Sequence, residues 1–200
     1  MPLIGNAAID DCANVIEWVP YDKFQDIRQI AIGRCGTIYY ARWVGGFIDN
    51  WDIENKQWER WSQIEVALKK FNGVDMNEEF LNEVAILLKT NFEMTSTRLY
   101  GITKDPGTHK YTMILQYFGG GNLRNYLNNN FDWNDKLYFL KSLANDFSRI
   151  HKLDIVHCDF HPGNILKYSL ESKCIYISDF GLSKLVKENI VAFFSRKGNK

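Results

Sequence analysis

The segment from residue 156 to 181 constrains the fold and chemistry of this chain more than any other stretch. It contains Asp159, then Asn164 five residues later, and then Asp179 directly before a Phe-Gly pair. Two short, largely apolar runs, 164–168 and 174–178, flank a polar turn and predict a β-hairpin. Such a hairpin returns Asp179 to the side of Asn164, where an amide and a carboxylate oxygen suit Mg²⁺. A turn whose polar residues only cap the backbone is the simpler alternative.

Composition limits the possible partners and compartments. The 200 residues carry 24 basic and 24 acidic side chains, so no net charge favours nucleic acid or an anionic membrane as a partner. The sequence shows neither a basic and apolar leader nor an apolar run of membrane-spanning length. It also lacks a C-x-x-C pair. We therefore expect a soluble, intracellular and cytoplasmic protein with free thiols at Cys12, Cys35, Cys158 and Cys174.

Residues 24–44 alternate as two antiparallel strands would, around a turn that contains glycines. Gly33 and Gly36 let backbone N–H groups approach phosphate oxygens closely, and Ala31 and Ile38 flank them. A plain hairpin with two glycines fits the same pattern. The next residues, 45–63, are rich in tryptophan and predict an extended connection whose rings pack on the strand surface. A tryptophan-rich protein-interaction loop is the alternative.

Residues 64–71 read IEVALKKF and predict the next strand. Successive side chains on a strand point to opposite faces, so Val66 and Leu68 share one face and Ala67 and Lys69 share the other. Lys69 is therefore the candidate for contact with a ligand, and the adjacent Lys70 is its rival. An ordinary exposed lysine is the simpler reading of either residue.

Residues 77–91 predict a helix with an apolar stripe at Phe80, Val84, Leu87 and Leu88. Glu83 lies on that stripe, and a carboxylate that points inward needs a cation. A solvated edge of the helix is the alternative for Glu83.

The rest of the chain predicts two more strands, at 99–103 and 111–115, and one long helix at 132–152. Asp132 is the expected cap of this long helix. Its expected buried positions are Leu137, Leu140, Ala144, Phe147 and Ile150.

In this order the features resemble the eukaryotic protein-kinase catalytic domain, nearest to its tyrosine-kinase-like group. The resemblance implies an α+β fold of two lobes. An antiparallel β-sheet and one main helix form the N-lobe, and a partial C-lobe is mainly helical. The chain would divide into a lead-in, 1–23, and a kinase domain, 24–200. The domain would consist of the N-lobe at 24–115, a hinge at 116–122 and a partial C-lobe at 123–200.

The resemblance also implies ATP and Mg²⁺ as cofactors and a protein as substrate. Asp159 would orient the acceptor hydroxyl, Glu83 would hold Lys69 against the phosphates, and Asn164 and Asp179 would bind the metal. Asn122 would also cap a helix at 123–127. The nucleotide contacts would be Ile30, Ala31, Gly33, Gly36, Ile38, Ala67, Lys69, Leu115, Gln116, Phe118, Asn122 and Leu166.

The sequence departs from the family pattern at several positions. Cys158 replaces the arginine that pairs with a phosphorylated activation segment, and His161 replaces a lysine. Ala31 and Cys35 weaken the glycine loop. Ser183 and Ser195 are phosphorylatable, and no A-P-E motif follows before residue 200, so we expect a domain that is incomplete at its C-terminus.

The expected function is ATP-dependent transfer of phosphate to a protein hydroxyl, with serine or threonine favoured over tyrosine. Two alternatives remain open. The loop HCDFHPGN, including His161, resembles that of aminoglycoside and choline phosphotransferases. The missing C-terminal motifs favour a non-catalytic, ATP-binding scaffold. A dinucleotide oxidoreductase fits poorly, because no strand–GxGxxG–helix unit is present.

Overall fold

The computed structural model describes residues 16–33, 35–52, 54–73, 76–91, 95–129 and 132–186. Residues 1–15 of the predicted lead-in and the segment 187–200, with Ser195, lie outside the described residues. The described chain forms two compact units, one within 16–80 and 98–117 and the other within 81–97 and 118–186. No described helix combines the length and apolar character needed to cross a membrane.

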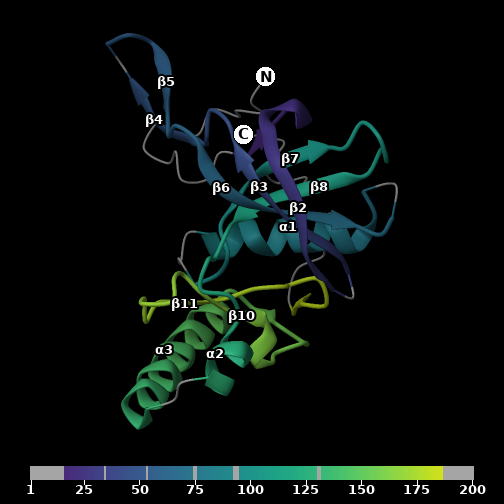
Figure 1. Ribbon diagram of the computed structural model, residues 1–200. Coiled ribbons are helices and arrows are strands. Elements are labelled where there is room, and N and C mark those ends of the chain that lie inside the picture. The colour runs from purple at the N-terminus through teal and green to yellow at the C-terminus, as the bar shows by residue number, and fades with distance from the viewer. Residues whose placement is uncertain are drawn as a thin grey trace. The chain divides into compact units, whose positions relative to one another are not determined.

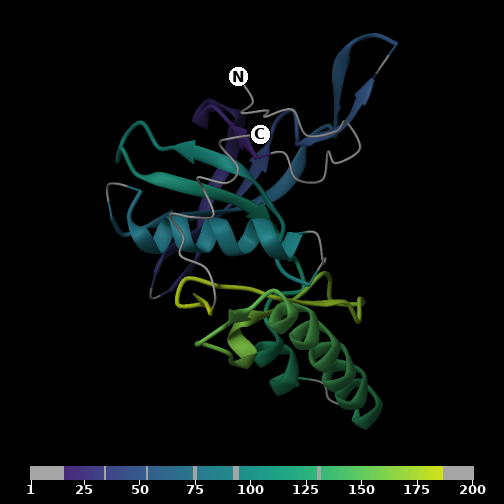
Figure 2. The same cartoon turned by 180° about the vertical axis from the view of Figure 1, so that it is seen from behind.

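The first unit is built on a six-stranded sheet with the order β1-β7-β8-β6-β3-β2. Figure 1 shows this sheet in purple, blue and teal. Its pairs are antiparallel except for β1 with β7, which is parallel. Figure 2 shows β7 and β8 side by side from behind. The strands are β1 (Glu17–Trp18), β2 (Phe24–Ile32), β3 (Gly36–Trp43), β6 (Ile64–Phe71), β7 (Leu99–Lys104) and β8 (Tyr111–Gln116).

The core of the first unit lies on one face of this sheet. Trp43, Val66, Leu68 and Ile114 are each 1% exposed or less, and Phe24 packs beside them. Burial of such side chains supplies about 1.5–3 kcal/mol each. Val66 and Leu68 therefore share the face that the alternation of β6 predicted.

The connection from β3 to β6 differs from the prediction of an extended segment. It folds into its own hairpin of β4 (Ile48–Asp52) and β5 (Gln57–Arg60), which projects beyond the sheet in Figure 1. Trp51 and Trp58 face each other across this hairpin, with ring centroids 4.7 Å apart. The prediction failed because aromatic side chains supply cross-strand pairing here without a regular apolar alternation.

The predicted helix at 77–91 is confirmed as α1 (Glu78–Asn91). Asn77 begins it, because its Oδ1 accepts a hydrogen bond from the backbone N–H of Phe80 at 2.9 Å. The four residues of the predicted apolar stripe are all buried. Glu83 is only 1% exposed, so the solvated-edge alternative for this residue is wrong.

The second unit contains the two helices α2 (Leu123–Asn129) and α3 (Trp133–Lys152). Two small antiparallel sheets accompany them, β9 (Ile155–Val156) with β12 (Lys184–Leu185), and β10 (Ile165–Lys167) with β11 (Ile175–Ile177). The core of this unit joins α2, α3 and the β10–β11 hairpin through Leu123, Phe139, Ile165 and Ile175.

The predicted buried face of α3 is only partly right. Ile150 is fully buried, but Leu137 and Leu140 are 63% and 62% exposed, and Ala144 is exposed too. Phe139, Asp146 and Ile150 face inward instead. The helix carries apolar residues along two stripes, and the stripe interrupted by Asp146 is the one that packs on the hairpin core.

The cap prediction for α3 is also wrong in its detail. Asp132 occupies the N-cap position but makes no capping hydrogen bond with its side chain. Its carboxylate accepts a hydrogen bond from Asn134 Nδ2 instead, at 3.1 Å.

Candidate active site

The second unit contains Asp159, Asn164 and Asp179, the three polar residues that the sequence analysis started from. The predicted hairpin is confirmed, with Ile165 opposite Ile177 and Lys167 opposite Ile175. A short 3-10 helix, Pro162–Asn164, leads into it. The first strand therefore starts directly after Asn164, and the second ends one residue before Ser178.

Asn164 links the two sides of this site by hydrogen bonds. Its Nδ2 donates to the backbone oxygen of Asp159 at 3.0 Å. Its own backbone oxygen accepts from both the N–H and the hydroxyl of Ser178, at 2.9 and 3.0 Å. Asp179 follows Ser178 directly, so Asn164 fixes the backbone beside both carboxylates.

The side chain of Asn164 is oriented to leave its oxygen available. Because Nδ2 donates to a carbonyl, Oδ1 is the free end of the amide, and no described residue donates to it. Amide and carboxylate oxygens are the donors that Mg²⁺ prefers, so Asn164 and Asp179 fit that metal. Among the described residues there is no cluster of three or more acidic, histidine or cysteine side chains placed to hold a metal ion.

His157 is a further residue of this site that the sequence analysis did not identify. It is 3% exposed, and its Nε2 lies 3.0 Å from the backbone oxygen of Ser178. The N–H of Asp159 points to the His157 backbone oxygen, at 2.8 Å, and to its Nδ1, at 3.4 Å. A neutral ring with its proton on Nε2 satisfies both contacts.

Burial is the main cause of a lowered pKa at His157, although the hydrogen bond to Ser178 and the nearby Asp179 and Asp159 oppose it. The neutral imidazole is therefore the stable form in the folded protein. The position of His157 two residues before Asp159 was the one sequence signal for this role. Its partner Ser178 lies 21 residues further along the chain, so the sequence alone did not show the contact.

His161, one of the departures from the family pattern, has a structural role. Its Nδ1 accepts the N–H of Gly163 at 3.0 Å and so caps the 3-10 helix. The guanidinium of Arg124 on α2 reaches the same ring nitrogen at 3.4 Å. The free side of the ring is therefore Nε2.

The second half of the predicted hinge belongs to this unit and joins the same hairpin. The Phe118 ring packs on Tyr176 at a centroid distance of 5.0 Å. Asn122 pairs with Leu166 in an isolated β-bridge, and Oδ1 of Asn122 accepts the N–H of Asn125 at 3.0 Å. The predicted cap of α2 is thus confirmed.

Helix α1 contributes Glu83 and a link to the segment after Asp179. Nδ2 of Asn82 donates to the backbone oxygen of Ser183 at 2.7 Å. The hydroxyl of Ser183 donates to the backbone oxygen of His157 at 2.9 Å. Ser183 is 2% exposed, so the expectation that it is available for phosphorylation is wrong for this conformation.

The first unit holds the other predicted site residues on adjacent strands. Ile38 of β3 lies opposite Lys69 of β6, and Ala67 lies opposite Leu115 of β8. The glycine turn is closed by a hydrogen bond from Gly33 N–H to the Gly36 oxygen at 2.8 Å. On the neighbouring strands, Ala31 pairs with Ile38, Gln116 pairs with Val66, and Ile30 is 45% exposed.

The structure separates Lys69 from its rival Lys70. Lys70 lies on the Val66 and Leu68 side of β6 and forms an ion pair with Asp105. Burial alone would raise the pKa of Asp105, but hydrogen bonds from Lys70, Gly107 and Thr108 outweigh it and lower this pKa to about 2. Lys69 is on the other face and is 4% exposed.

Comparison with known proteins identifies the family. The model of the family described as protein tyrosine and serine/threonine kinase matches residues 24–198. A serine/threonine-protein kinase/receptor of Acanthamoeba polyphaga mimivirus is 27% identical over 189 residues, which cover 90% of this chain and 10% of the relative.

Two plant proteins are also similar. Mitogen-activated protein kinase kinase 7 of Arabidopsis thaliana is 31% identical over 128 residues, which cover 62% of this chain and 40% of the relative. Wall-associated receptor kinase-like 13 of the same plant is 30% identical over 178 residues, or 82% of this chain and 20% of the relative. The chain thus spans about a tenth of the mimivirus relative's length. The family match over most of its residues establishes that the chain belongs to the protein tyrosine and serine/threonine kinase family.

Proposed function

We propose that this chain contains the nucleotide-binding and catalytic residues of a protein kinase that transfers the γ-phosphate of ATP to a serine or threonine hydroxyl. The observation that carries the proposal is the hydrogen-bonded unit around Asn164. It fixes the backbone of Asp159 on one side and that of Ser178 and Asp179 on the other. Phosphoryl transfer depends on positioning and charge stabilisation, which such a preorganised loop supplies.

Lys69 and Glu83 are the proposed clamp for the phosphates. Lys69 is 4% exposed and Glu83 is 1% exposed, and a buried charge needs an opposite charge. An ion pair between them would aim the ammonium group at the α- and β-phosphates. Lys70 already forms an ion pair with Asp105 on the opposite face of β6, which supports Lys69 as the lysine that pairs with Glu83.

Asn164 and Asp179 are the proposed metal ligands. A Mg²⁺ ion held there would neutralise charge on the phosphates. The available Oδ1 of Asn164 and the carboxylate of Asp179 give it two oxygen ligands from residues whose backbones are bonded through Ser178. His157 keeps this arrangement in place, because it contacts Ser178 and Asp159 at once.

Asp159 is the proposed acceptor of the substrate hydroxyl proton. Its backbone is held by His157 and Asn164, which fixes the point from which its carboxylate would reach the hydroxyl. We infer a protein substrate rather than an aminoalcohol because the family match is to protein kinases. The remaining nucleotide contacts would come from the glycine turn, Ala67 and the hinge. Intracellular location stays a prediction.

The test is transfer of radiolabel from the γ-phosphate of ATP to casein, with and without Mg²⁺, and in parallel to a panel of aminoalcohols. We expect label on serine and threonine of casein and none on the aminoalcohols. Replacing Asp159 by Asn should lower the transfer rate by about 10²- to 10⁴-fold while binding of a fluorescent ATP analogue persists.

Glu171→Gln, an exposed acidic residue in the β10–β11 turn region, is the matched control and should leave transfer unchanged. ATP binding without transfer in the wild-type chain would contradict the proposal and support the scaffold alternative. Label on an aminoalcohol but not on casein would contradict the assignment of a protein substrate.

A further inference from the structure

The β4–β5 hairpin is not needed to connect the strands on either side of it. Strands β3 and β6 pair antiparallel along their whole length, up to Trp43 opposite Ile64. A loop of about two to five residues usually joins such neighbours. The chain instead places residues 44–63 between them, and β4 and β5 within this segment form a separate two-stranded sheet.

The base of this hairpin is held firmly to the first unit. The Arg60 guanidinium donates to the Gly46 oxygen at 2.6 Å and to the Glu17 carboxylate at 2.8 Å. The backbone N–H of Trp61 donates to the backbone oxygen of Phe47 at 3.0 Å. Gly46 has φ +55°, and a Cβ on it would lie 1.7 Å from the Trp61 oxygen, so only glycine permits this close crossing.

The described residues at the far end of the hairpin make contacts of their own. The Asp52 carboxylate accepts the N–H groups of Glu54 and Asn55, at 2.9 and 3.0 Å. These hydrogen bonds, with Asn55 the main contributor, lower the pKa of Asp52. Trp51 and Trp58 add their cross-strand ring contact.

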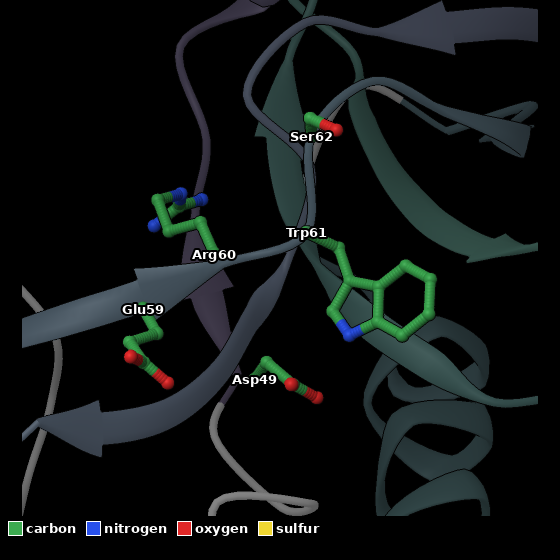
Figure 3. A pocket seen from close by; sticks show the side chains of 5 residues that line it. All are labelled: Asp49, Glu59, Arg60, Trp61 and Ser62. Atoms are coloured by element: carbon green, nitrogen blue, oxygen red, sulfur yellow. The ribbon is translucent and has the colours of Figure 1, made fainter.

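An open pocket of about 510 Å³ lies beside this hairpin, lined by Asp49, Glu59, Arg60, Trp61 and Ser62. Figure 3 shows the ring of Trp61 and the carboxylate of Asp49 on one side of the chain, with the Arg60 side chain pointing away from that of Glu59. Trp61 is 54% exposed, and its ring stacks on Phe47 at an interplanar angle of 11°.

The charge of this pocket is negative. No described residue forms a hydrogen bond or ion pair with the side chain of Asp49 or Glu59. The one cation in the lining, Arg60, already bonds Glu17 and two carbonyl oxygens. An exposed indole face beside two unpaired carboxylates is the combination that attracts a cation, through the ring quadrupole and through direct charge.

We propose that this pocket, formed by Asp49, Glu59 and Trp61, is a docking site for an arginine- or lysine-bearing segment of a protein partner. The side chain of the basic residue lies against the indole of Trp61, and its charged end meets the two carboxylates. Arginine fits best, because its planar guanidinium both stacks on an aromatic ring and binds carboxylates with two hydrogen bonds. This site is independent of the proposed phosphate transfer.

The test uses the full chain and three labelled peptides of identical length: one with Gly, Ser and four Arg residues, one with Lys in place of Arg, and one with Glu. Fluorescence anisotropy measures their binding at low and high salt. We expect the Arg peptide to bind most tightly and the Glu peptide not to bind. Binding should weaken as salt rises from about 0.05 to 0.5 M, because exposed charges are screened.

Variants locate the bound peptide. Trp61→Ala should weaken binding of the Arg peptide about three- to tenfold. The double variant Asp49→Lys with Glu59→Lys should weaken it by at least about tenfold, because it reverses the charge of the pocket. Trp133→Ala, at another exposed tryptophan, is the matched control and should bind as the wild type does.

Circular dichroism checks that each variant keeps the fold, since all three pocket side chains lie at the surface. Equal binding of the Arg and Glu peptides would overturn the proposal. So would unchanged binding in both pocket variants, or no binding by the wild type. Loss of binding in Trp133→Ala to the same degree would place the peptide elsewhere and would also overturn it.

Discussion

Asp146 should make the folded protein less stable at neutral pH, and its replacement by Asn should relieve that cost. The residue lies on the inward face of α3 and is 9% exposed. No described residue forms a hydrogen bond or ion pair with it. Burial raises the pKa of Asp146 from 3.8 to about 6, and the charge of Arg149 only partly opposes this.

The size of the effect follows from the difference between the two pKa values. The unfolded chain releases this proton near pH 3.8, whereas the folded protein keeps it to about pH 6. The folded state therefore binds more protons between these values, and its stability falls as pH rises through that window. A difference of about two pKa units corresponds to about 3 kcal/mol. Relaxation of the site reduces this, so we expect Asp146→Asn to gain about 1–3 kcal/mol near pH 8.

The assay is urea unfolding of the wild type and of Asp146→Asn, followed by circular dichroism at about pH 4, 6 and 8. The gain in unfolding free energy should be smallest at the lowest pH, where the folded-state carboxyl is neutral and the unfolded-state carboxyl is only partly ionised, and it should grow with pH. Asp132→Asn, at the exposed start of the same helix, is the control and should change stability by less than about 0.5 kcal/mol at each pH. A gain that is independent of pH, or largest in acid, would refute the reasoning.

Four further substitutions test the two units separately. Lys69→Met should lower phosphate transfer by about 10²- to 10³-fold, as measured by radiolabel transfer. Lys70→Met should spare transfer and cost about 1–3 kcal/mol in urea unfolding, because it leaves Asp105 without its cation. The opposite pattern would show that the strand register is misassigned. Because burial lowers the pKa of His157 in the folded state, its neutral form contributes stability above the unfolded pKa of about 6.5 that is lost as pH falls below it. His157→Gln should abolish that acid-side loss in unfolding measurements, and an identical pH profile in both proteins would contradict it. Gly36→Ala should cost about 1–3 kcal/mol, because a Cβ there would lie 2.3 Å from the Lys70 oxygen, and an unchanged thermal midpoint would contradict it.

Local periodicity predicted the parts of the site that rest on one regular element. Alternation along β6 placed Lys69 on the face away from Val66 and Leu68, and the pairing of Lys70 with Asp105 agrees with that register. The stripe of α1 likewise predicted that Glu83 is buried. A strand or helix that buries one face carries that information in its own sequence, because a shift of one residue would turn every side chain to the wrong side.

Periodicity failed where two local patterns compete or where none exists. Helix α3 has two apolar stripes, and only the packing of Phe139 and Ile150 against the second unit's hairpin decides between them. That decision also buries Asp146, which a pattern of apolar residues cannot anticipate. The β4–β5 hairpin is stabilised by Trp51, Trp58 and the turn around Asp52, without the regular alternation that identifies a strand.

The catalytic loop shows the limit of local reasoning most clearly. Cys158 and Asp179 both have positive φ, +60° and +61°, which costs about 1 kcal/mol or more for residues other than glycine. Neither residue adopts this conformation from its own preference. Hydrogen bonds from distant residues hold it: Ser178 to Asn164 on one side, and His157 to Ser178 on the other. The conformation that brings Asp159 and Asp179 to one site is therefore a property of the packed unit. The side chains of Asn164 and His157 hold it, because they bond the backbone of Asp159 and of Ser178.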